Sequence, residues 1–118
     1  MILPAPDEAL WIAVVRLVVE VPGSRSLKDK RRAVHQVRDR LRARSNLSVA
    51  EVGHLEDHTR AVLALSMVGN DPRVLRSALD RMLHDVGTWR NVLVASRDVE
   101  ILQPFDGWQD TRYDPVDD

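Results

Sequence analysis

Residues 47–68 read LSVAEVGH, LEDH and TRAVLALSMV: an extended run, a short polar turn and a second extended run. Aliphatic and β-branched residues dominate both runs, which is typical of strands, and the short turn between them predicts an antiparallel hairpin. The second run is almost unbroken in its apolar character, so it predicts a strand in the middle of a sheet. The predicted strands are Leu47–His54 and Thr59–Val68, joined by the turn Leu55–His58.

A strand and a helix precede this hairpin. Residues Leu10–Val21 alternate with a period of two and are rich in β-branched side chains, which predicts a strand ended by Pro22-Gly23. Ser26, with Asp29 three residues later, forms a capping-box pattern that predicts the start of a helix, and the helical pattern fades at Ser45-Asn46. Helical spacing places four apolar residues on one side of this helix: Leu27, Val34, Val37 and Leu41.

A second helix and a fourth strand follow the hairpin. Asp71 as N-cap, Pro72 at the first helical position and Gly87 as C-cap predict the bounds of the helix. The predicted core side of this helix holds Val74, Ala78, Leu79, Met82, Leu83 and Val86. Residues Asn91–Leu102 are the predicted fourth strand. Trp89, just after the helix, is interpreted as a cap for the core rather than as a platform for base stacking.

The element order β-α-β-β-α-β is the split-βαβ arrangement. With right-handed crossovers it predicts an α+β fold, a ferredoxin-like βαββαβ sandwich whose four-stranded antiparallel sheet has the order 4-1-3-2 and carries both helices on one face. We expect an N-terminal arm over residues 1–9, the ferredoxin-like domain over 10–103 and an acidic C-terminal tail over 104–118. The tail holds three of the five aromatic residues, which predicts that part of it packs onto the domain: Phe105, Trp108 and Tyr113.

The composition is that of an ordinary globular chain, with 44% hydrophobic and 30% charged residues. The absence of cysteine excludes disulfides and thiolate metal sites. The chain begins without the basic region of a secretory signal and has no apolar run long enough to cross a bilayer, so we expect a cytoplasmic protein without membrane contact. Its net charge of −1 is uneven: residues 25–44 hold nine basic and two acidic residues, which makes that segment +7 and the rest −8.

Three stretches of the chain resemble the YlxP-like family, bacterial proteins of unassigned function. They are Pro22–Arg32, with its run GSRSLKDKRR, then Asn46–Val52, and Arg60-Ala61; the likeness covers residues 10–102. Where the family has an aromatic-Gln pair before Arg-Ala, this chain has His58-Thr59. The resemblance implies a ferredoxin-like fold. It also implies a role with RNA or the ribosome, because genes of the family often lie among those for translation and ribosome maturation.

The first predicted helix has one strongly basic side. At 100° per residue, six side chains fall within about a third of its circumference, beside the apolar side: Lys28, Arg31, Arg32, His35, Arg38 and Arg42. A one-sided basic pattern is typical of polyanion binders, whereas the alternative is a solvated helix side paired to acidic groups elsewhere. The candidate nucleic-acid-binding residues are Lys28, Lys30, Arg31, Arg32, Arg38 and Arg42. The third strand has no aromatic residue, so we do not expect bases to stack on the sheet.

Two further groups of residues are candidate binding sites. Ser24 and Ser26, with the backbone N–H groups of the helix start, are candidate anion ligands, although plain N-capping is the favoured alternative. His54 and His58 bracket two carboxylates that a divalent metal would accept, but a polar hairpin tip needs no metal. We therefore predict no metal site and no cofactor.

The sheet face away from the helices should carry Ile12, Val14 and Val18. An apolar open face predicts an oligomer interface, and a homodimer is the expected form. No grouping of catalytic residues is evident. The sequence thus predicts a non-enzymatic binding protein that associates with RNA or the ribosome through its basic helix. The alternative is a protein–protein interaction or oligomerisation module without a nucleic-acid role.

Overall fold

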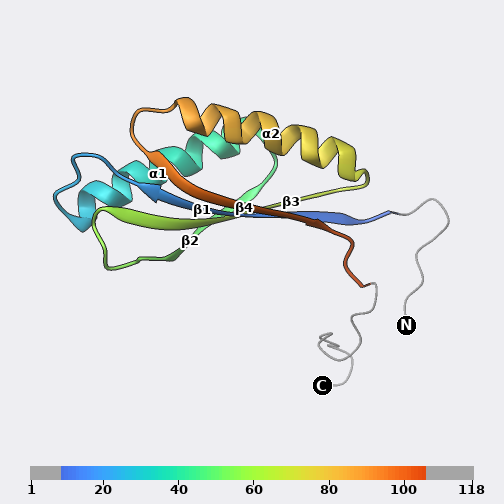
Figure 1. Cartoon of the computed structure of the whole chain (residues 1–118), viewed down its shortest axis with the longest axis horizontal. Helices are drawn as coiled ribbons and strands as arrows, with labels where there is room; N and C mark the ends of the chain where they lie inside the picture. The colour runs from blue at the N-terminus through green and yellow to red at the C-terminus, as the bar shows by residue number, and fades with distance from the viewer. Residues whose placement is uncertain (1–8, 106–118) are drawn as a thin grey trace, which may run out of the picture.

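The computed structural model describes residues 9–105, which form a four-stranded sheet with two helices packed on one side (Figure 1). The elements are β1 (Trp11–Glu20), α1 (Leu27–Arg44), β2 (Ser48–Gly53), β3 (Arg60–Gly69), α2 (Pro72–Thr88) and β4 (Leu93–Leu102). The strand order is β2-β3-β1-β4 and each neighbouring pair is antiparallel, which confirms the predicted ferredoxin-like α+β fold. Predictions about residues 1–8 of the arm and 106–118 of the tail, including Trp108 and Tyr113, lie outside the described residues.

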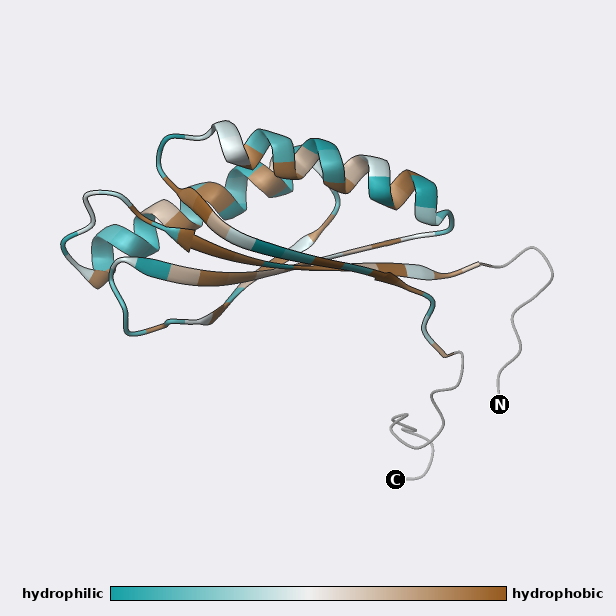
Figure 2. Cartoon of the chain, in the orientation of Figure 1, coloured by the Kyte–Doolittle hydropathy of each residue, from teal (hydrophilic) through white to brown (hydrophobic). Residues whose placement is uncertain are grey.

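β1 lies at the centre of the sheet, paired with β3 on one side and β4 on the other. Alternation of its side chains puts Ala13, Val15, Leu17 and Val19 under the helices, where all four are fully buried. The intervening residues face the open side, as predicted. Figure 2 shows that β1 is hydrophobic along most of its length, whereas hydrophilic and hydrophobic residues alternate along both helices. None of the helices within residues 9–105 is both long and apolar enough to span a bilayer.

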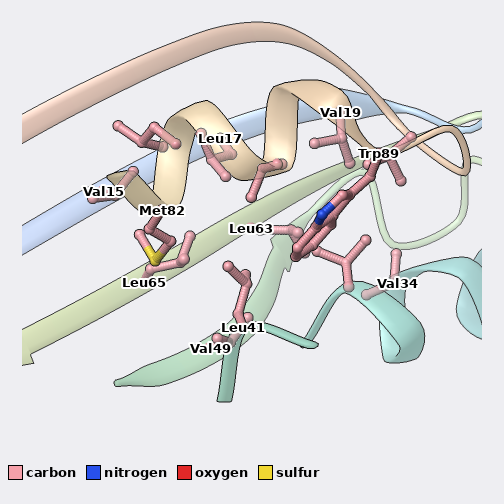
Figure 3. Close-up of a cluster of buried hydrophobic side chains, with 14 of the residues drawn as sticks. Val15, Leu17, Val19, Val34, Leu41, Val49, Leu63, Leu65, Met82 and Trp89 are labelled. Carbon is pink, nitrogen blue, oxygen red and sulfur yellow. The ribbon is translucent and has the colours of Figure 1, made fainter. Parts of the chain in front are cut away.

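One hydrophobic core fills the space between the sheet and the helices (Figure 3). Both helices contribute to it, α1 through Val34 and Leu41 among others and α2 through Met82. Trp89 points into this cluster and is 7% exposed, which confirms its interpretation as a cap for the core.

Two predictions about α2 were wrong in detail. The helix continues through Gly87 to Thr88, and Trp89 is its C-cap, with its N–H bonded to the Val86 carbonyl at 3.1 Å. The chain leaves the helix there because the indole of Trp89 is drawn into the core. In the first turn, Leu75 is buried and Val74 is 64% exposed, since Leu75 shares the row i, i+4, i+7, i+11 with the other core residues of the helix.

Candidate nucleic-acid interface

The start of α1 is fixed by hydrogen bonds within the chain. The Ser26 hydroxyl accepts from the Asp29 N–H at 3.0 Å, as in a capping box. The Asp29 carboxylate, however, accepts from the N–H of Arg25 at 3.1 Å rather than from that of Ser26, and the Ser24 hydroxyl donates to the Ser26 carbonyl at 3.1 Å. This geometry is that of an N-cap with a carboxylate where an anion would bind. The anion site at Ser24 and Ser26 therefore stays a prediction without support from these contacts.

The basic side of α1 lies on the surface of the molecule. We define the basic stripe as Lys28, Arg31, Arg32, His35, Arg38 and Arg42; all are exposed except Arg38, which is half-buried. Arg38 forms an ion pair with its neighbour Asp39 at 3.2 Å. No acidic side chain among residues 9–105 forms an ion pair with the other three arginines or with Lys28. Four cations of the stripe thus have no acidic partner in the described part of the chain.

Lys30 is not part of this surface, and its assignment to the nucleic-acid site was wrong. It is 0% exposed, and its Nζ lies 2.8 Å from Glu51 Oε2 on β2. The same ammonium donates to the carbonyl oxygen of His54 at 2.8 Å and makes a longer contact, 3.5 Å, with that of Leu55. Because Lys30 follows Leu27 by three residues, helical spacing puts it on the core side. Lys30 joins α1 to the β2–β3 hairpin.

The turn of that hairpin is held by a carboxylate. Asp57 Oδ1 accepts from the backbone N–H of Thr59 at 2.8 Å and from its hydroxyl at 2.7 Å, and these hydrogen bonds lower the pKa of Asp57 below its ordinary 3.8. His54 adopts a positive φ of 54°, which turns the chain out of β2. Within residues 9–105 the His, Asp and Glu side chains do not gather in threes at any point.

A cleft that the sequence did not predict lies between the C-terminal half of α1 and the α2–β4 connection. It has a volume of about 850 Å³ and is lined by Gln36, Asp39, Arg40 and Arg44 from α1, and by Asp85, Thr88, Trp89, Arg90 and Asn91 from the other side. The Arg44 guanidinium lies 2.7 Å from the Asp85 carboxylate and bridges the two walls. The guanidinium carbon of Arg40 lies 4.2 Å from the centre of the Trp89 ring. The one sequence signal for this cleft was the row of polar residues Gln36, Arg40 and Arg44, spaced four residues apart on α1.

The open sheet face carries the predicted apolar residues. Val14 is 41% exposed, and Ile12 and Val18 are partly exposed on the same face. At the centre of this face Arg16 and Asp98 form an ion pair at 2.8 Å across β1 and β4. The homodimer remains a prediction.

Both edges of the sheet carry a charged residue on the helix side. Glu51 on β2 pairs in register with buried Leu63, and Arg97 on β4 pairs with buried Leu17. Inward-facing charges at edge strands oppose pairing with another sheet.

Known proteins are similar to this chain in two respects, a family model that matches its sequence and solved structures that are similar to its fold. A family model described as "Protein of unknown function (DUF503)" matches residues 12–99. No curated protein matches the sequence. Among solved structures, the de novo designed protein Foldit4 is similar with a TM-score of 0.50 and 12% identity, over 80% of this chain and 97% of that one. A C-terminal segment of the alpha subunit of aIF2 from Pyrococcus abyssi is also similar, with a TM-score of 0.35 and 14% identity. That match covers 83% of this chain and 52% of the other. The likeness to the designed protein shows the fold alone.

Proposed function

The chain belongs to the DUF503 family of proteins of unknown function, and we propose that it binds RNA through the basic stripe of α1. One observation carries the proposal: four exposed cations on one helix have no acidic partner within residues 9–105. The charge distribution supports it. Residues 9–105 hold 16 basic and 11 acidic residues, a formal charge of +5, and nine of those basic residues lie between positions 25 and 44.

A finer assignment belongs to the same proposal. Within the family, we place the chain among the YlxP-like proteins because of the run from Gly23 to Arg32. That placement favours ribosomal RNA as the ligand and hence the cytoplasm as the compartment.

The proposed binding is electrostatic and is not catalytic. From Lys28 to Arg42 the stripe is about 21 Å long, at 1.5 Å of rise per residue, which is enough for several phosphates of one strand. Each phosphate that meets a lysine or arginine releases condensed counterions, and arginine forks suit phosphate oxygens in particular. Such contacts orient the RNA without selecting its sequence. The role therefore needs charge and shape, and no reacting group.

A charge-reversal pair tests the proposal against a matched control. Arg31→Glu with Arg42→Glu removes two cations of the stripe, and both side chains are exposed. Arg60→Glu with Arg97→Glu changes the net charge equally, at two exposed arginines on strands. Binding of labelled single-stranded RNA is measured for all three proteins across a salt series.

If four cations meet phosphates, the logarithm of the wild-type binding constant should fall with the logarithm of salt at a slope of about −3. The stripe variant should show a slope of about −1.4, because two phosphate contacts remain. The control should keep the wild-type slope. Absence of wild-type binding at low salt, or equal weakening by the two variants, contradicts the proposal.

A second candidate function is self-association through the open sheet face, favoured by the exposure of Val14 and Val68. A second copy of the chain is the occupant that the charges favour. Pairing of two copies through their helices would bring two basic helix layers together, and these repel each other. Pairing through the sheet edges is opposed by the inward-facing charges there. Pairing through the open face meets neither obstacle, because its central charges, Arg16 and Asp98, already neutralise each other.

This candidate has its own matched variants. Val14→Lys should shift the mass measured by light scattering toward that of a monomer, while Val74→Lys, at an exposed valine of α2, should leave it unchanged. Lysine at position 14 lies opposite Glu100 in the register, so the fold should tolerate it. A wild-type protein that is already monomeric removes this function.

A further inference from the structure

A row of four side chains leads from the basic stripe into the cleft between α1 and α2. Arg32, Gln36, Arg40 and Arg44 are spaced four residues apart, so successive members lie about 6 Å apart along one side of the helix. Arg32 belongs to the stripe, while the other three line the cleft. This row therefore connects the basic stripe to the cleft on the surface of α1.

Arg40 presents a flat surface to this cleft. Its guanidinium carbon lies over the ring of Trp89, 4.2 Å from the ring centre, and the Arg40 residue is exposed. Arg40 has no acidic partner among residues 9–105. Because Trp89 is buried and Arg40 is exposed, the group available to a ligand at this point of the cleft is the Arg40 guanidinium rather than the indole. Guanidinium planes of this kind stack on unpaired bases of RNA.

Two amides lie beside this surface. Asn91 Nδ2 donates to Gln36 Oε1 at 3.3 Å, across the cleft. The Asn91 Oδ1 atom is buried and has no hydrogen-bond donor among the described residues. A buried acceptor without a donor is unfavourable, and amide side chains commonly bond the amino groups on base edges. Arg90 at the rim is exposed and forms no ion pair within residues 9–105, so it is available to a phosphate.

From these contacts we infer that the cleft takes the base of one unpaired nucleotide in the RNA strand that the basic stripe binds. The base stacks on Arg40, its edge faces the amides of Gln36 and Asn91, and Arg90 meets its phosphate. The inference rests on the proposed function and adds to it a contact with a base, which the stripe does not provide. The ligand class is single-stranded RNA, since a paired base cannot leave its helix without losing its partner.

Binding to two ligands of equal charge distinguishes the contact with a base from phosphate binding. One is a labelled single-stranded RNA, and the other is an abasic ribose-phosphate strand of the same length. Gln36→Ala and Arg40→Lys leave the net charge unchanged but remove an amide and the guanidinium plane. Gln103→Ala, at an exposed glutamine after β4, is the matched control. Thermal melts establish that every variant is folded.

The wild type should prefer RNA over the abasic strand by on the order of tenfold, the lower part of the range for stacking one base. Gln36→Ala and Arg40→Lys should bring that ratio close to one with little change in affinity for the abasic strand, and Gln103→Ala should keep it. Equal wild-type affinity for the two strands overturns the cleft but not the stripe. A preference that survives in both variants also overturns the cleft. Failure of the wild type to bind either strand overturns the proposed function and the inference together.

Discussion

Lys30→Met removes the ammonium group between α1 and the β2–β3 hairpin but keeps most of the buried stem. That ammonium is fully buried, 2.8 Å from Glu51 Oε2, and it donates to the His54 carbonyl at 2.8 Å. The substitution leaves the Glu51 carboxylate, whose side chain is 18% exposed, without its partner. It also leaves the His54 carbonyl without this donor. Within residues 9–105 no other ion pair joins the helix to this hairpin, so apolar contacts should then hold the two together.

The expected loss of stability is about 3 kcal/mol. Removing one partner of a buried ion pair costs about 3–5 kcal/mol, and we take the lower end because Glu51 keeps some contact with water. About 1 kcal/mol of the loss belongs to the hydrogen bond to His54. Since about 1 kcal/mol shifts the Tm of a domain of this size by roughly 4–8 °C, the Tm should fall by on the order of 15 °C. The variant should still fold if the domain has a typical stability of about 5–15 kcal/mol.

A double-mutant cycle at neutral pH, measured by guanidinium denaturation, tests this reasoning. Lys30→Met with Glu51→Leu removes both charges, so its cost should be smaller than the sum of the two single costs by about 2 kcal/mol. Lys28→Met, two residues away and exposed, should change stability by less than about 0.5 kcal/mol. Additive single effects, or a Lys30→Met protein as stable as the Lys28→Met protein, would refute the buried pair.

Two further predictions concern hydrogen bonds at the element ends. Ser26→Ala should lower the free energy of unfolding by about 1 kcal/mol, because the Asp29 N–H loses its acceptor; an unchanged denaturation midpoint would contradict that cap. The pKa of Asp57 is lower in the folded protein than its ordinary 3.8, so its contribution to stability is present above that value and is lost as pH falls through the folded pKa. Thr59→Val removes the hydroxyl donor, so its Tm should fall less between neutral and acidic pH than that of the wild type; equal falls would refute this linkage.

The topology could be predicted because each element has its own period along the chain. The alternation in β1 and the helical spacing of Val34, Val37 and Leu41 are local patterns, and their order leaves few arrangements. The predictions were wrong where contacts between distant residues decide the end of a helix or the side of it that is buried. Gly87 has the sequence pattern of a C-cap, but α2 continues to Thr88 and the buried Trp89 is its C-cap. Val74 and Leu75 are both apolar and adjacent in the sequence, so the sequence does not show which of them faces the sheet; in the structure Leu75 is buried and Val74 is exposed.

The candidate site also has a part that the sequence could predict and a part that it could not. Exposure of Lys28, Arg31 and Arg42 follows from helical spacing, so the sequence could place them. The polar row of α1 indicates only one wall of the cleft. The cleft itself could not be predicted, because its other wall comes from the α2–β4 connection, and no spacing links positions so far apart. Lys30 was assigned by its charge although its spacing from Leu27 and Val34 placed it on the core side.

The run from Ser26 to Arg32 therefore contains two kinds of residue, and a pair of lysines can tell them apart. Lys28 is exposed and belongs to the basic stripe, whereas Lys30 is buried against Glu51. Lys28→Met should weaken RNA binding and reduce the salt slope by about 0.7 while stability stays unchanged. Lys30→Met should lower stability while the folded protein, assayed well below its Tm, keeps the wild-type salt slope. A loss of salt slope in Lys30→Met would mean that its ammonium reaches the RNA, and the division of this run into a structural and a binding side would be wrong.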